Sequence, residues 1–176
     1  LLEIFADKID DRLHLDCGKH FSALYKSVCI EIHRYVSTHI NGKYGKKFGT
    51  FAKKGLRDNL GMISIGTEEI SVPETTFNSF YVFDHLFEHF LTSGVGLRQM
   101  SDWMLFLSKN KENIDKNLLY DMLKTMDMLK PWKQFGNVLV DYLGLPASDF
   151  PFYEPSDRTE DILKNNPYKL VEDIDG

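Results

Sequence analysis

Two histidines and a glutamate within residues 83–107 (FDHLFEHFLTSGVGLRQMSDWMLFL) have the spacing of a zinc site. His85, Glu88 and His89 form the pattern H-x-x-E-H, in which the histidines bind the metal and the glutamate acts as general base. On a helix these positions share one face. A catalytic zinc site also needs a third protein ligand, and the acidic residues further along have no recognisable setting for one. We therefore favour histidines that pack or hydrogen-bond within a helical layer, and keep a zinc hydrolase as the less favoured alternative.

A basic and an acidic residue follow that motif at helical spacing. Arg98 and Asp102 are four residues apart, so on the helix expected over residues 97–109 they can pair across one turn. Because most of their neighbours in this segment are apolar, we expect Arg98 to lie in an apolar layer. There a guanidinium group needs Asp102 or an anionic ligand as its partner.

A third candidate is a carboxylate on a predicted strand, in the segment VCIEIHR (residues 28–34). Apolar Val28, Ile30 and Ile32 alternate with the other positions, which predicts a strand with one apolar face and places Glu31 and His33 together on the opposite face. A carboxylate held by a strand offers the oxygen ligand that Mg²⁺ prefers.

The segment at residues 43–57 (KYGKKFGTFAKKGLR) contains six basic residues and no acidic one. It lacks the G-x-x-x-x-G-K-[ST] pattern of a phosphate-binding loop. We favour an amphipathic helix whose Phe48, Phe51 and Leu56 face inward. The alternative is contact with nucleic acid or a protein partner through the basic patch, which consists of Lys46, Lys47, Lys53 and Lys54.

These residues belong to elements whose order predicts an α+β fold. Two short β-hairpins are expected within residues 20–36 and 62–72, and Ile63, Ile65, Ile70 and Val72 are the expected packing residues of the second. Four helices follow, near residues 75–93, 97–109, 115–128 and 131–143. Thr75 or Thr76 is the expected cap of the first, and Phe80, Phe83, Phe87 and Phe90 or Leu91 form its expected core stripe. From residue 146 a proline-containing tail, extended over the surface, carries one short helix near residues 157–165.

Composition places limits on the class of protein. Apolar residues make up 43% of the 176 residues, which favours a folded domain. Cys17 and Cys29 do not form a disulfide framework, and no apolar run reaches the length of a membrane helix. We expect a soluble, cytoplasmic protein without membrane contact. The first residue is Leu rather than Met, which favours a fragment or processed product.

The strand segment IEIHRYV, followed after about fifty residues by HLFEHFLTSGVGLRQMSDWMLF, resembles the bacterial uncharacterised nucleotidyltransferase family. Members have a strand ending in E-[IL]-H, a helix with histidines about four apart, and G-[IV]-G-L-R with an Asp four residues after the Arg. The resemblance covers residues 12–145.

The resemblance implies a polymerase-β-like core that transfers a nucleoside monophosphate from a nucleoside triphosphate to an acceptor. Two Mg²⁺ ions would be bound by three acidic residues, of which Glu31 matches the third. On this basis we expect cofactor binding by Arg98 and His33. Arg98, held by Asp102, would have a structural or phosphate-facing role, with His85 and His89 as supporting residues.

The chain departs from the family pattern ahead of Glu31. The G-[GS] and D-x-D motifs that supply the first two acidic ligands are absent. We therefore expect the C-terminal portion of a nucleotidyltransferase, inactive by itself, with a sheet remnant at 1–73, a helical subdomain at 74–145 and an acidic tail at 146–176. The alternative is a non-catalytic domain that binds nucleic acid or a protein.

Overall fold

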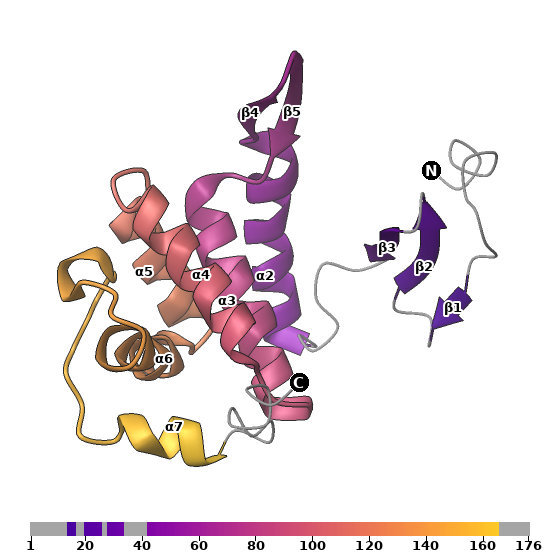
Figure 1. Cartoon of the computed structure of the whole chain (residues 1–176). Coiled ribbons are helices and arrows are strands. Elements are labelled where there is room, and N and C mark those ends of the chain that lie inside the picture. Colours follow the sequence, from indigo (N-terminus) through magenta and orange to yellow (C-terminus); the bar gives the residue numbers. More distant parts are fainter. Residues whose placement is uncertain (1–13, 17–19, 26–27, 34–41, 166–176) are drawn as a thin grey trace. The chain divides into compact units, whose positions relative to one another are not determined.

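The structure, a computed structural model, describes residues 14–16, 20–25, 28–33 and 42–165 (Figure 1). Its contacts divide the chain into two compact units, Leu1–Asn41 and Gly42–Gly176. The three-part division at residues 73 and 145 stays a prediction.

The first unit contains a three-stranded antiparallel sheet. Its strands are β1 (His14–Asp16), β2 (His20–Tyr25) and β3 (Val28–His33), in the order β1-β2-β3. The predicted hairpin is confirmed as the pair β2–β3, although residues 34–36, which end the prediction, lie outside the described residues. Strand β1 was not predicted, because three residues are too few to show an alternating pattern.

The second unit is mainly helical. It begins with α2 (Gly42–Lys53) and one π-helical turn at Lys54–Asp58, followed by the hairpin β4 (Gly61–Ile65) and β5 (Glu68–Val72). Four longer helices, a short 3₁₀ turn and one shorter helix follow. They are α3 (Thr75–Thr92), α4 (Leu97–Asn110), α5 (Lys116–Thr125), α6 (Leu129–Asp141), the turn Ala147–Asp149 and α7 (Thr159–Asn165). The α+β class, with two hairpins and then helices, is confirmed.

Helix α3 begins at a side-chain cap other than the predicted one. The Glu74 carboxylate accepts hydrogen bonds from the backbone N–H groups of Thr76 and Phe77, each at 2.8 Å. The predicted threonine caps are therefore wrong, because both threonines are already helical. A carboxylate at this end also interacts favourably with the helix dipole.

Aromatic side chains fill the centre of the second unit. The Phe83 ring lies 5.0 Å from Trp103, 5.1 Å from Trp132 and 5.7 Å from Phe135, measured between ring centroids. All four side chains are at most 1% exposed. These contacts join α3, α4 and α6, and each such aromatic pair contributes about 0.5–1.5 kcal/mol beyond its burial. The predicted stripe is confirmed at Phe80 and Phe83, while Leu91 is 65% exposed.

The segment after α6 belongs partly to this core. Phe150 is 3% exposed, and Trp132 donates its indole N–H to the Pro151 carbonyl at 2.9 Å. Phe150 packs directly on the backbone of Gly136, where an added Cβ would lie 2.0 Å from the ring. The expectation that the segment after residue 146 lies extended over the surface is thus wrong here. Its prolines and acidic residues suggested exposure, but one of its phenylalanines is deeply buried. The predicted short helix is confirmed as α7.

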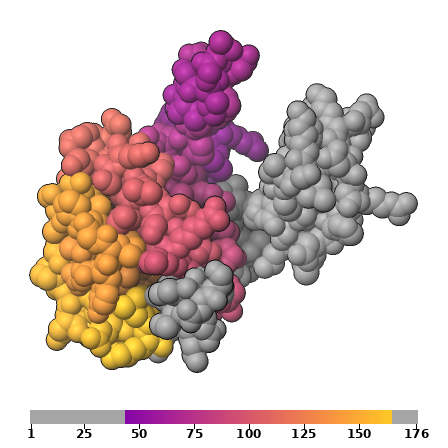
Figure 2. Space-filling model, in the orientation of Figure 1, coloured from indigo at the N-terminus to yellow at the C-terminus, as the bar shows by residue number. Residues whose placement is uncertain are grey.

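The hairpin β4–β5 exposes its apolar side chains. Ile63, Ile65 and Ile70 are 45%, 58% and 44% exposed, and Val72 is half-buried. Figure 2 shows the hairpin as the purple projection from the surface of the helical unit. The prediction that these isoleucines are packing residues is wrong, because a two-stranded ribbon that projects in this way leaves both of its faces open.

Candidate functional site

The two histidines of the H-x-x-E-H pattern contact each other on the surface of α3. Their Nε2 atoms are 3.2 Å apart, and His89 Nδ1 lies 3.4 Å from Ser93 Oγ. At this separation one Nε2 donates a hydrogen and the other accepts it. His85 is exposed and His89 is half-buried. The supporting role of both stays a prediction.

A third zinc ligand does not accompany this pair in the part of the chain that the structure describes. No group of three His, Cys, Asp or Glu side chains is arranged to hold a metal ion there. Two histidines alone are one ligand short of the three that a catalytic zinc site uses.

The buried acidic residue beside the motif was not predicted from the sequence. Asp84 is 9% exposed on α3, and burial, together with the Glu88 carboxylate one turn away, raises its pKa from 3.8 to about 7. Burial raises the pKa of Tyr81, and the charges of Asp84 and Glu88 raise it further. The sequence did contain a signal for this residue, namely a single aspartate among phenylalanines that are buried in the structure. Asp84 can therefore bind or release a proton near neutral pH.

Arg98 and Asp102 lie on the outer face of α4. Both side chains are exposed, and among the described residues the structure contains no ion pair between them. The prediction that Arg98 lies in an apolar layer is wrong, because the buried face of α4 consists of Met100, Trp103 and Leu107 instead. Arg98 is thus accessible to an external anion.

The basic segment forms the amphipathic helix that was predicted. Phe48 is 4% exposed, and its ring lies 6.4 Å from Phe77 and 6.2 Å from Phe80. Phe51 and Leu56 are half-buried. All four side chains of the basic patch are exposed, namely Lys46, Lys47, Lys53 and Lys54. The helix therefore packs on α3 through its aromatic face and presents its lysines to solvent.

Glu31 occupies a fixed register position in the sheet of the first unit. Its Cα partner on β2 is Ser22, whose partner on β1 is His14. Two residues further along β3, His33 pairs with His20, which pairs with Asp16. The two outer strands thus each hold one acidic residue, and these lie two strand spacings of about 4.8 Å each apart across the sheet and two register positions apart along it.

Comparison with known protein families identifies one family that the chain matches. The sequence model of a family described as uncharacterised nucleotidyltransferases matches residues 8–144. The chain belongs to this family. The match begins ahead of β1 and ends just after α6, so it spans both compact units.

Other comparisons give no closer relationship for this nucleotidyltransferase family member. No curated protein matches the chain, and no solved structure matches it. No helix among the described residues of this family member is long and apolar enough to cross a membrane.

The family match covers every residue singled out by the sequence analysis. Glu31, the basic patch, the histidine pair and the Arg98 segment all fall within residues 8–144. Asp84 and Asp16 fall within it too. The segment that packs Phe150 against α6 lies outside it.

Proposed function

We propose that Glu31 supplies one carboxylate of a magnesium-dependent nucleotidyltransferase site that transfers a nucleoside monophosphate from a nucleoside triphosphate to an acceptor. The observation that carries this proposal is the family match over residues 8–144, which includes β3 and the helices after it. The backbone of β3 supports it, because β3 pairs with β2 along all six residues and so places position 31 inside a fully paired strand.

The donor chemistry of the sheet fits Mg²⁺ in part. Carboxylate oxygens are the preferred ligands of this ion, and the strands contain two carboxylates, Glu31 and Asp16. When bound, a pair of Mg²⁺ ions activates the attacking oxygen and stabilises the departing pyrophosphate. The family pattern uses three acidic residues, with the first two in a D-x-D strand. This sequence contains no such pair ahead of Glu31.

From this we infer that the 176-residue chain does not carry out the transfer by itself. Asp16 stands alone on a three-residue strand, and two strand spacings separate it from Glu31, so it does not reproduce the close D-x-D pair. Two carboxylates from a D-x-D segment complete the site in this proposal. Glu31 would then provide the third carboxylate that holds the metal ions.

Arg98 and His33 are the proposed nucleotide-binding residues. The exposed guanidinium of Arg98 has five N–H donors that suit a phosphate group. His33 lies two positions from Glu31 on the same strand. Asp102, one turn after Arg98, would limit the conformations of the arginine when a nucleotide is bound.

The test compares two polypeptides in binding of a nucleoside triphosphate with and without Mg²⁺. One is the 176-residue chain, and the other carries a G-[GS] and D-x-D segment ahead of Leu1. We expect Mg²⁺-dependent binding by the longer polypeptide, and a loss of about tenfold on Arg98→Ala. Lys109→Ala is the matched control, because Lys109 is also exposed on α4. Tight Mg²⁺-dependent binding by the 176-residue chain alone would contradict the proposal.

A second candidate function is contact with nucleic acid through the basic patch. Its four lysines are all exposed on one helix and the turn after it, although the whole chain has a net charge of −5. Binding through these lysines would weaken as salt rises, since each phosphate contact releases a counterion. We expect the patch with all four lysines replaced by alanine to lose this binding. Absence of any DNA or RNA binding at low salt would remove this candidate.

A further inference from the structure

A polar groove in the second unit takes no part in the function proposed above. It has a volume of about 540 Å³ and lies between the end of α5, the first half of α6 and the segment ahead of α7. Its lining residues are Lys124, Asp127, Leu129, Lys130, Lys133, Gln134, Asn137, Glu154, Pro155, Ser156 and Arg158. A groove of this volume accommodates a small organic molecule.

The charge of the groove is opposite to that of the chain. Four basic side chains line it against two acidic ones, whereas the whole chain carries a net charge of −5. One basic residue, Lys133, forms an ion pair with Glu154 across the groove. This excess of positive charge favours an anionic ligand.

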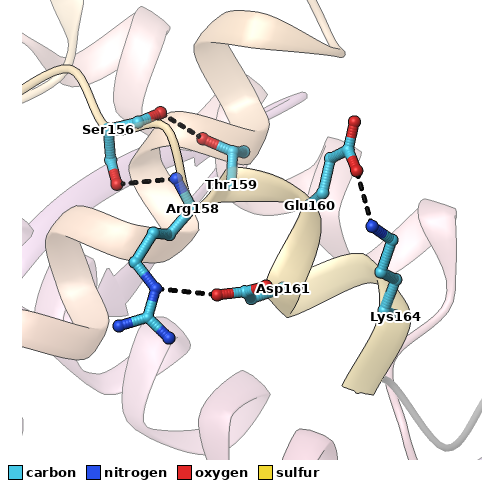
Figure 3. Close-up of polar contacts among 6 residues, drawn as sticks. All are labelled: Ser156, Arg158, Thr159, Glu160, Asp161 and Lys164. Atoms are coloured by element: carbon cyan, nitrogen blue, oxygen red, sulfur yellow. Dashed lines mark hydrogen bonds and ion pairs between the residues drawn. The ribbon is translucent and has the colours of Figure 1, made fainter.

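Arg158 is held at the edge of the groove with part of its guanidinium group available. Its Nε donates to Asp161 Oδ2 at 2.8 Å, and its backbone N–H donates to Ser156 Oγ at 3.1 Å. Figure 3 shows these contacts, with the two terminal nitrogens of Arg158 at the far end of the side chain. The hydroxyl of Thr159, which is 5% exposed, lies 3.0 Å from Asp141 Oδ2 and ties the start of α7 to the end of α6. The arginine therefore has a fixed backbone position beside the groove.

The first turn of α6 faces the groove without a side-chain cap. Leu129 and Lys130 line the groove, the first turn contains no acidic residue, and Met128 at the cap position makes no side-chain hydrogen bond. The helix is 13 residues long, and the turn ahead of it contains Asp127 in the left-handed conformation, with φ of 59°. The start of such a helix carries partial positive charge and attracts anions.

Two turns further along α6, the groove is lined by a buried amide. Asn137 is 1% exposed, and its Oδ1 has no hydrogen-bond partner. A buried polar atom without a partner destabilises a protein, so a ligand in the groove that bonds to this oxygen would gain affinity from the bond. An oxygen acceptor calls for a hydroxyl or amino group on that ligand. At 1.5 Å per residue, Asn137 lies about 10 Å along the helix from Lys130.

We propose that this groove binds a phosphorylated sugar. The phosphate lies at the start of α6, where Lys130, Lys133 and Arg158 surround it, and a sugar hydroxyl donates to Asn137 Oδ1. From a phosphate at the start of α6, a sugar phosphate extends further along the helix toward Asn137 than a free phosphate ion does. The sugar can be free or part of a nucleotide, since both have this phosphate and hydroxyl chemistry.

The experiment is a titration of the isotope-labelled 176-residue chain, followed by NMR, with four probes. The probes are ribose 5-phosphate, adenosine monophosphate, inorganic phosphate and ribose. We expect shifts of groove residues with saturable binding of the two phosphorylated sugars, at least about tenfold tighter than binding of phosphate or ribose. Equal affinity for ribose 5-phosphate and adenosine monophosphate assigns the site to the sugar phosphate alone, and tighter binding of the latter assigns it to a nucleotide.

Three variants separate the parts of the proposal. Lys130→Ala should weaken binding of both phosphorylated sugars about tenfold or more, because it removes a charge-assisted contact to phosphate. Asn137→Leu should reduce the affinity for ribose 5-phosphate to that for inorganic phosphate while it raises the melting temperature of the free protein, because the unpaired amide is removed. Lys164→Ala should leave binding unchanged, because Lys164 pairs with Glu160 on α7 and does not line the groove.

Two results would overturn the proposal. The first is the absence of groove shifts with every phosphorylated probe. The second is binding that Lys130→Ala leaves unchanged, since this exposed lysine can be replaced without loss of the fold.

Discussion

The pH dependence of stability offers a direct test of the buried carboxyl group on α3. Because the folded protein raises the pKa of Asp84 from 3.8 to about 7, it binds this proton more tightly than the unfolded chain does. The stabilising contribution is therefore fully present below pH 4 and is lost as pH rises through 7. At about 1.4 kcal/mol per pKa unit, the total loss is about 4 kcal/mol.

Replacing Asp84 by Asn removes the ionisable group and keeps its shape. We expect the Asp84→Asn variant to have a larger free energy of unfolding than the natural chain at pH 8. At pH 5 this gain should be smaller by about 2–3 kcal/mol. Glu88→Gln should reduce the fall in stability with pH, because the Glu88 carboxylate is the second cause of the raised pKa. Urea unfolding at several pH values measures these changes, with Asp121→Asn at an exposed position of α5 as the control. A gain that is equal at pH 5 and pH 8 would refute the reasoning.

Three further substitutions test the packing and capping described above. Gly136→Ala should lower the free energy of unfolding by about 1–3 kcal/mol in urea titrations, because the new methyl group meets the Phe150 ring. Gly49 lies inside α2 with open space around its Cβ position, so Gly49→Ala should instead raise the free energy of unfolding by up to about 1 kcal/mol. Equal effects of the two substitutions would contradict the packing of Phe150 on Gly136. Glu74→Ala should cost about 1 kcal/mol by removing the cap of α3, seen by calorimetry as a melting temperature about 2–4 °C lower, whereas an unchanged value would show that the cap contributes nothing.

The hydrophobic pattern was sufficient to predict most elements of the fold. Alternating residues marked the hairpins, and the helical spacing of Phe80 and Phe83 marked α3, because burial of one face imposes these periods on a sequence. The family resemblance was likewise available from the sequence, and the match over residues 8–144 confirms it. Strand β1 was missed since its three residues carry no period.

Burial was harder to predict than helix or strand. Arg98 was expected in an apolar layer because its helix is rich in apolar residues. Yet Leu97 and Leu105 are about half exposed, and Arg98 shares their outer face. The isoleucines of the β4–β5 hairpin were likewise predicted to be packing residues because they are apolar, and they are exposed. The apolar composition of a segment indicates that part of it is buried. Which of its residues are buried depends on the elements that pack against it.

The groove could not be predicted from the sequence, for a different reason. Its basic residues extend from Lys124 to Arg158 and have no common motif. They meet only because the segment after α6 folds back on this helix, fixed by Phe150 on Gly136 and by the Trp132 hydrogen bond to Pro151. Asn137 likewise looks like an ordinary helix residue until its unpaired oxygen is seen.

The most direct test of the central claim is a measurement of metal binding at Glu31. Mn²⁺, which replaces Mg²⁺ and is detected by electron paramagnetic resonance, is titrated with a nucleoside triphosphate into the polypeptide that carries the D-x-D segment. The control is Glu68→Gln, which removes an exposed glutamate from the β4–β5 hairpin. We predict that Glu31→Gln weakens nucleotide-dependent Mn²⁺ binding by at least about tenfold, while the control binds like the unaltered polypeptide. Unchanged Mn²⁺ binding by Glu31→Gln would contradict the assignment of Glu31 as a metal ligand.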